Sequence, residues 1–223
     1  MFGRIARRYD LMNRLMTFGC DRAWRRYVVQ QATLPPGGCL LDVGVGTGDI
    51  ALEVLERNDS ARVMGADFTL AMMDVGRRRR GGQRVGWVSA DALALPFPDG
   101  SFDAVTSGYL MRNVSDVLGA FREQVRVVRP GGRVVCLDTT PPPPGPLRPL
   151  IRFYLRAVIP LLGRLVARDA PAYAYLPEST QAFKAPGELA ALMREAGLVD
   201  VRYRRFMLGT MAVHVGIRPA ETA

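Results

Sequence analysis

The chain has 223 residues, enough to bury the core of one domain, and its 48% hydrophobic and 23% charged residues are typical of a globular protein and exclude a disordered one. No run of about 18 uncharged apolar residues occurs, so no transmembrane helix is predicted. The net charge of +9 predicts attraction to polyanions, but charge alone does not choose among nucleic acid, an anionic membrane surface and an acidic substrate.

The N-terminal segment carries charges throughout the stretch where a secretory signal peptide would be apolar. No signal peptide is therefore predicted, and we expect a cytoplasmic protein. We assign residues 1–36 to an N-terminal helical cap. The three cysteines, Cys20, Cys39 and Cys136, lack C-x-x-C spacing, so neither disulfides nor a metal site is predicted.

The next feature is an apolar run that breaks into a glycine-rich turn, LLDVGVGTGDIAL at residues 40–52. Gly44, Gly46 and Gly48 let the backbone turn tightly and approach a ligand, which predicts a strand, a cofactor-binding turn and a helix. The dinucleotide pattern G-x-G-x-x-G requires a third glycine where this chain has Asp49, and no G-K-[ST] follows to make a P-loop. The alternative is an ordinary strand-to-helix turn.

Charge around this turn narrows the class of cofactor. Asp42 precedes the turn, Asp49 follows it, and no Lys or Arg lies within residues 40–52, so a pyrophosphate would be repelled. The turn therefore favours a cofactor that is not an anion.

Downstream, short apolar strands alternate with helices of about a dozen residues. The predicted helices are 49–57, 69–80 and 114–128, and the predicted strands after the glycine turn are 62–67, 85–90, 101–110 and 132–138. This alternation predicts an α/β fold with a doubly wound, mostly parallel sheet, which binds ligands at the carboxyl ends of its strands.

Polar residues lie at those predicted strand ends: Asp67, Asp91, Ser107 and Asp138. Asp67 follows the first glycine by a little over 20 residues, a spacing that predicts a carboxylate accepting both hydroxyls of a ribose. Asp91 is predicted to accept a hydrogen bond from an adenine amino group. For both residues the alternative is a helix N-cap, a common role of Asp at a strand-to-helix junction.

Residues 141–184 depart from the alternation and are assigned to a helical lid insert. After the extended linker PPPPGP, Arg148, Arg152 and Arg156 form a basic stripe beside an apolar helix face. Pro160 is predicted to break this pattern into two short helices. Two compatible interpretations stay open: a lid with solvated arginines, and a lid that rests on an anionic membrane through residues 147–168.

The C-terminal part, residues 185–218, predicts a closing helix at 186–196 and an antiparallel strand pair, GLVDVRYRRF and MLGTMAVHVGIRP. His214, the only histidine, lies in the second strand and is interpreted as a packing residue or, alternatively, as a proton acceptor. The whole chain is thus predicted to be one domain, with its cofactor-binding core at residues 37–140.

The chain resembles the ubiquinone/menaquinone biosynthesis C-methyltransferase family in motifs that occur in the expected order: YDLMNRLMTFG, LLDVGVGTGD, DALALPFPDGSFD, RNVSD, RVVRPGGRVVCLD, AYAYLPEST and AVHVG. The resemblance implies a class I methyltransferase fold, S-adenosyl-L-methionine as the cofactor, and C-methylation of a polyprenylated quinol ring. Demethylmenaquinol is the favoured substrate, with 2-polyprenyl-6-methoxy-1,4-benzoquinol as the alternative.

By position, the resemblance assigns cofactor contacts to Thr47, Asp67, Ala90, Asp91 and Ser107, and the turn residues Asp42, Gly44, Gly46 and Gly48 complete the predicted set. Departures from the family pattern fall elsewhere. Cys20 and Asp21 replace a His-Arg pair, residues 109–111 differ before the RN dipeptide, and DTTPP replaces EFSKP after the fifth strand. These changes affect the expected ring and the fit of the lid more than cofactor binding.

C-methylation of such a ring needs a carbon made nucleophilic by ionisation of a neighbouring hydroxyl, so a cation near that oxygen favours the reaction. Arg112 is predicted to supply this charge and Asn113 to orient an oxygen, with a cap of the following helix as the alternative role. Candidate proton acceptors are Asp138, Tyr173 and His214, which the sequence does not rank. The lid is expected to keep the site dry.

The same residues are less consistent with other functions. A nucleic-acid methyltransferase would use the positive charge, but residues 107–109 read SGY where [DN]-P-P-[YFW] is expected, so no specific nucleic-acid partner is predicted. A non-catalytic subunit of a quinone-biosynthesis assembly would bind the cofactor without turnover. A dehydrogenase fits least, because Asp49 stands where the dinucleotide-binding pattern requires its third glycine. The expected partners are a lipophilic quinol, the inner face of the cell membrane through the lid, and a second copy of the chain.

Overall fold

The structure is a computed structural model that describes residues 14–162 and 183–220. Its centre is a seven-stranded sheet with the order β3-β2-β1-β4-β5-β7-β6. The strands are β1 (Cys39–Val43), β2 (Arg62–Asp67), β3 (Val85–Ser89), β4 (Phe102–Gly108), β5 (Val128–Thr139), β6 (Val199–Phe206) and β7 (Met211–Ile217). β7 runs antiparallel to β5 and β6, and the other pairs are parallel. The predicted mostly parallel sheet with an antiparallel closing strand is confirmed.

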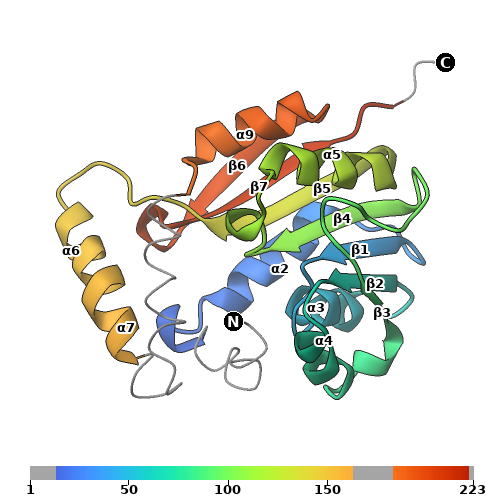
Figure 1. Cartoon of the computed structure of the whole chain (residues 1–223), viewed down its shortest axis with the longest axis horizontal. Coiled ribbons are helices and arrows are strands. Elements are labelled where there is room, and N and C mark those ends of the chain that lie inside the picture. The colour runs from blue at the N-terminus through green and yellow to red at the C-terminus, as the bar shows by residue number, and fades with distance from the viewer. Residues whose placement is uncertain (1–13, 163–182, 221–223) are drawn as a thin grey trace.

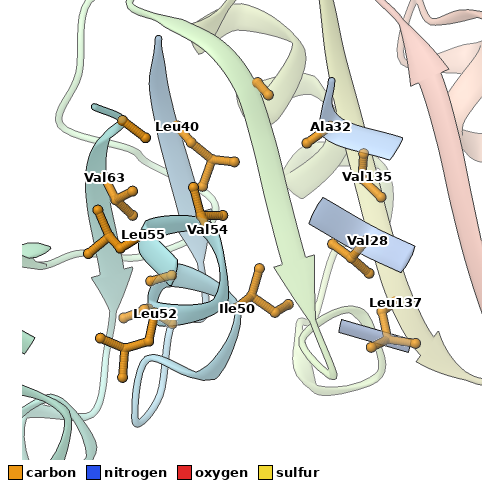
Figure 2. Close-up of a cluster of buried hydrophobic side chains, with 14 of the residues drawn as sticks. Val28, Ala32, Leu40, Ile50, Leu52, Val54, Leu55, Val63, Val135 and Leu137 are labelled. Atoms are coloured by element: carbon orange, nitrogen blue, oxygen red, sulfur yellow. The ribbon is translucent and has the colours of Figure 1, made fainter. Parts of the chain in front are cut away.

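Helices cover both faces of this sheet (Figure 1). The helices on one face are α2 (Asp21–Ala32), α3 (Asp49–Arg57) and α4 (Leu70–Arg77), and those on the other are α5 (Val117–Val127) and α9 (Pro186–Glu195). Because side chains alternate along a strand, Leu40 of β1 packs into the core under α2 and α3, whereas Leu41 packs into the core under α5 and α9. Figure 2 shows the first core, where Val28 and Val135 meet.

Several predicted elements have different ends in the structure. The helix predicted at 69–80 ends at Arg77, ahead of a turn that contains Gly81 at a φ of +84°. The helix predicted at 114–128 begins at Val117, because the carboxylate of Asp116 accepts the backbone N–H of Gly119 at 2.9 Å and caps it. β5 begins at Val128, directly after that helix, and includes the RPGG segment, so it starts earlier than the strand predicted at 132–138.

The described part of the lid is one helical run, so the predicted break at Pro160 is wrong. The run consists of α6 (Arg148–Phe153), the π-helix η3 (Tyr154–Val158) and α7 (Ile159–Leu162), which follow one another without a gap. The wider π-turn accommodates a residue that lacks an N–H and whose ring would clash with the carbonyl four residues earlier. The Tyr154 hydroxyl donates to the carbonyl of Met16 at 2.8 Å, which ties the run to the N-terminal part.

Within the ranges that the structure describes, no helix is both long and apolar enough to cross a membrane.

Candidate cofactor-binding site

A cleft of about 490 Å³ opens at the carboxyl ends of β1, β2 and β4. These ends meet at one edge because the strands are parallel neighbours, so residues distant in sequence share one wall. The predicted cofactor residues that line the cleft are Asp42, Gly44, Gly46, Thr47, Asp67, Ala90 and Asp91. Two others, Gly48 and Ser107, are outside its lining. Ser107 is completely buried within β4.

The backbone of the turn explains its alternate glycines. Gly44, Gly46 and Gly48 have φ values of +71°, +53° and +85°, a region that side chains disfavour. A Cβ on Gly44 would lie 3.0 Å from the Leu110 side chain, and one on Gly48 would lie 2.8 Å from the ring of Trp87. Gly48 therefore shapes the turn from behind the cleft.

Asp67 ties two segments of the cleft wall together. One carboxylate oxygen accepts the Gly46 N–H at 2.8 Å, and the other accepts the Thr69 N–H at 2.7 Å. The N-cap of α4 is Thr69, so the alternative role of Asp67 as that cap is wrong. Because Asp67 also lines the cleft, its predicted contact with a ribose stays a prediction that the geometry favours.

Asp42 is a buried carboxyl at the floor of the cleft, with 2% of its surface exposed. Burial and, less strongly, the nearby carboxylates of Asp67 and Asp49 raise the pKa of Asp42 to about 7, although a 2.8 Å hydrogen bond from the Thr106 hydroxyl opposes the shift. A cation bound in the cleft would stabilise the ionised carboxylate and lower this pKa.

The negative charge of Asp49 is compensated by two arginines that lie outside the turn sequence. Its carboxylate binds Arg25 of α2 at 2.7 Å and Arg79, which follows α4, also at 2.7 Å. Residues 40–52 contain neither arginine, because Arg25 comes from α2 and Arg79 from the turn after α4. The only sequence signal is the four-residue spacing of Asp21 and Arg25, which form an ion pair at 3.0 Å.

The lining remains acidic with Arg25 included. Four carboxylates line the cleft, from Asp42, Asp49, Asp67 and Asp91, against the single guanidinium of Arg25 among the described residues. A cofactor with a positive centre and ribose hydroxyls fits this lining, and a pyrophosphate does not. S-adenosylmethionine has the first set of properties, since it carries a sulfonium cation and no phosphate.

The segment after β4 forms another wall of the cleft. Tyr109 lines the cleft at a φ of +59°, which is unusual for an aromatic residue and which the sequence did not predict. Asn113, at the end of the short helix η2 (Met111–Asn113), lines the cleft and donates to the Tyr109 carbonyl at 2.8 Å. The N-cap of α5 is Asp116, so the alternative of a cap at Asn113 is wrong.

Two predicted catalytic residues bind each other in the structure. The Arg112 guanidinium lies 2.6 Å from the Asp138 carboxylate, and the side chains are only 4% and 1% exposed. Neither residue is in the lining of the cleft. The prediction that Arg112 acts as a separate cation is therefore corrected: Asp138 offsets its charge, and both residues act as a buried pair.

The remaining candidates, Tyr173 and His214, do not line the described cleft. Tyr173 lies outside the described residues. His214 is buried in β7, where its Nε2 donates to the Pro186 carbonyl at 3.0 Å, and its ring packs against Tyr203. The structure therefore supports its interpretation as a packing residue. Burial lowers the pKa of His214 to about 4.

This low pKa predicts a loss of stability in acid. The folded pKa lies below the unfolded value of about 6.5, so the contribution is present above pH 6.5 and is lost as the pH falls through 4. The expected loss is about 3 kcal/mol in the free energy of unfolding. Urea unfolding at pH 7 and pH 4 should show a smaller loss for His214→Gln, which keeps a donor for Pro186 but does not titrate. An equal loss in both proteins would contradict the role of this histidine.

Comparison with known proteins agrees with this geometry. The sequence matches the ubiE/COQ5 methyltransferase family over residues 1–218. It is 50% identical over 218 residues to a ubiquinone/menaquinone biosynthesis C-methyltransferase of Desulfotalea psychrophila, covering 98% of this chain and 89% of that protein. It is 48% identical over 221 residues to a demethylmenaquinone methyltransferase of Thermus thermophilus, covering 98% of this chain and 100% of that protein.

Solved structures with low sequence identity share the fold. A phosphoethanolamine N-methyltransferase of Haemonchus contortus, in complex with S-adenosyl-L-methionine, has a TM-score of 0.65 at 15% identity, covering 88% of this chain and 52% of that one. A SAM-dependent methyltransferase of Thermotoga maritima has a TM-score of 0.66 at 19% identity, covering 97% of each chain. The predicted class I fold and S-adenosylmethionine cofactor are confirmed. The chain belongs to the ubiE/COQ5 methyltransferase family.

Proposed function

We propose that the protein methylates a ring carbon of a polyprenylated demethylmenaquinol with S-adenosylmethionine and so forms the menaquinol. The observation that carries this proposal is the acidic cleft at the strand ends of a chain that belongs to this family over residues 1–218. The name of the Thermus thermophilus relative, demethylmenaquinone methyltransferase, supports the naphthoquinol ring. A benzoquinol ring is the second candidate, because the Desulfotalea psychrophila relative is named for both ubiquinone and menaquinone biosynthesis.

The cofactor supplies an electrophilic methyl group when it is bound. On the protein side, the carboxylates of Asp67 and Asp91 are proposed to hold its ribose and its adenine. Both line the cleft, and the Asp91 carboxylate already accepts the Leu93 N–H at 2.9 Å, which fixes its orientation. The sulfonium of the cofactor is expected to lie near Asp42. Burial disfavours the ionised carboxylate of Asp42, and a nearby positive charge would stabilise it.

The substrate ring has to ionise, because a phenol hydroxyl has a pKa of about 10. Asn113 lines the cleft and is proposed to orient a ring oxygen. Arg112 and Asp138 are proposed to hold the 109–113 segment in place, since the Arg112 backbone N–H also donates to the Asp138 carboxylate at 3.3 Å. Tyr173 remains a proposed proton acceptor, whereas Asp138, which pairs with Arg112 outside the cleft lining, is assigned the supporting role instead.

The direct test is transfer of a labelled methyl group from S-adenosylmethionine to demethylmenaquinone in detergent, with the substrate either chemically reduced or oxidised. Methylation of the ring in the reduced form alone is expected, because only the quinol offers an ionisable hydroxyl. Mass spectrometry locates the methyl group. Transfer to the reduced benzoquinol analogue only would select the second candidate, and no transfer to either ring would overturn the proposal.

The lid is proposed to contact an anionic membrane surface, from which a polyprenylated quinol would enter. Ile151, Leu155 and Ile159 recur on the buried face of the run. Its other faces expose the apolar side chains of Leu147, Leu150, Phe153 and Leu161 together with the basic side chains of Arg148, Arg152 and Arg156. Figure 1 shows α6 and α7 standing away from the sheet at one side of the molecule. This combination of basic and apolar side chains suits the interface of an anionic bilayer.

The double variant Arg148→Gln/Arg152→Gln should bind anionic vesicles more weakly. Each basic residue contributes about 1 kcal/mol at such a surface, so a roughly 30-fold loss of affinity is expected in a vesicle co-sedimentation assay. The matched control is Arg78→Gln/Arg80→Gln, which removes the same charge from two exposed arginines after α4. Equal losses in both variants would mean that net charge, rather than the lid, determines binding.

A further inference from the structure

Among the described residues, the charged side chains that line the cleft are four carboxylates and one guanidinium. Arg25 is the one Lys or Arg among the described residues that line it, and only 7% of its surface is exposed. S-adenosylmethionine has one anionic group, the carboxylate of its methionyl end. A carboxylate that enters a cleft with four acidic side chains needs a cation as its partner, because it would otherwise be repelled.

The position of Arg25 is fixed by contacts on two sides. Its Nη2 lies 2.7 Å from the Asp49 carboxylate and 3.0 Å from that of Asp21. Asp49 is the first residue of α3, directly after the glycine turn, so the guanidinium is held beside that turn. The side chain comes from α2, an element that contributes no other residue to the described lining.

Asp49 has a second cation that would compensate it when Arg25 engages a ligand. Arg79 binds the other oxygen of the same carboxylate at 2.7 Å and also donates to the Thr47 carbonyl at 3.0 Å. Arg79 is not in the lining of the cleft, whereas Arg25 is. The two arginines therefore share a partner but differ in access to a bound molecule.

We propose that Arg25 binds the carboxylate of the methionyl end of S-adenosylmethionine, while Asp49, held between the two arginines, faces the ammonium group of the same end. This assignment orients the cofactor, with its methionyl end toward α2 and its adenosine end toward Asp67 and Asp91. The assignment requires that S-adenosylmethionine binds in the cleft, and it does not depend on which quinol is methylated.

The test compares two ligands, S-adenosylmethionine and its decarboxylated analogue, by isothermal titration calorimetry without any quinol. The wild-type protein should bind the decarboxylated compound about 10- to 100-fold more weakly, the range for a lost charge-assisted hydrogen bond. Arg25→Gln should weaken S-adenosylmethionine by a similar factor and remove most of the difference between the ligands. Wild-type affinities for the two compounds within about threefold of each other would overturn the proposal.

Arg79→Gln is the matched control, because it removes the other cation of Asp49 from outside the cleft. It should leave the ratio of the two affinities unchanged, even where it weakens both. A ratio that collapses in Arg79→Gln as it does in Arg25→Gln would overturn the assignment to Arg25. If Arg25→Gln does not fold, the wild-type comparison and the Arg25→Lys variant, which keeps the charge, still decide the question. Selective binding without methyl transfer would reject the proposed substrate and keep this subsite.

Discussion

Replacing Arg112 by alanine is expected to lower the free energy of unfolding by about 3–5 kcal/mol, because it leaves the buried Asp138 carboxylate without its cation. The side chains of the pair are 4% and 1% exposed, so water cannot compensate the remaining charge. Urea unfolding measured against the wild type at pH 7 gives this difference directly. A loss below about 1 kcal/mol, the typical value of an exposed pair, would contradict the burial of this ion pair.

The matched control for this prediction is the double variant Arg112→Met/Asp138→Asn, which removes both charges at similar volume. It should be more stable than Arg112→Ala, because no uncompensated charge remains. Together with the single variants Arg112→Met and Asp138→Asn it completes a double-mutant cycle, which isolates the interaction of the two side chains. The turnover of Arg112→Ala is expected to fall with cofactor binding retained, and both have to be measured at temperatures where the variant is folded. Full activity in the folded variant would contradict a role for the pair in the reaction.

Asp67→Ala is expected to lower the affinity for S-adenosylmethionine by at least about 100-fold, because two charge-assisted hydrogen bonds to a ribose would be lost. The substitution also removes the acceptor of the Gly46 and Thr69 N–H groups, so the turn itself loses its support. Calorimetric titration gives the affinity, and urea unfolding without ligand gives the cost to the fold. Binding within about threefold of the wild type would contradict the ribose contact.

Asp91→Ala is the comparison for this variant, since it removes another carboxylate of the cleft lining. The Asp91 carboxylate accepts one N–H, from Leu93, in an exposed loop. Its loss should cost less stability than the loss of Asp67 and should weaken cofactor binding by a smaller factor, about 10-fold for one hydrogen bond. If the two variants weaken binding equally, the net negative charge of the cleft, rather than the ribose contact, determines affinity.

The sequence by itself determined the order of strands and helices, the glycine turn and the acidic residues at the strand ends. These features depend on local physics: side chains alternate along a strand, and a positive φ requires glycine at three positions of the turn. The shared edge of the cleft also followed, because the carboxyl ends of parallel strands meet in any such sheet. The family motifs identified the cofactor as S-adenosylmethionine, whereas the glycine turn and the charges around it predicted only a ligand that is not an anion.

Only the tertiary structure decided which charges meet. Arg25 reaches Asp49 from α2 and Arg79 reaches it from the turn after α4, and Arg112 binds Asp138 across 26 positions of the chain. No local pattern contains such contacts, since they depend on how far each helix runs and on how it packs against the sheet. The same reason applies to His214, whose role was open until α9 placed the Pro186 carbonyl against it, and to Pro160, which a π-turn accommodates in place of the expected break.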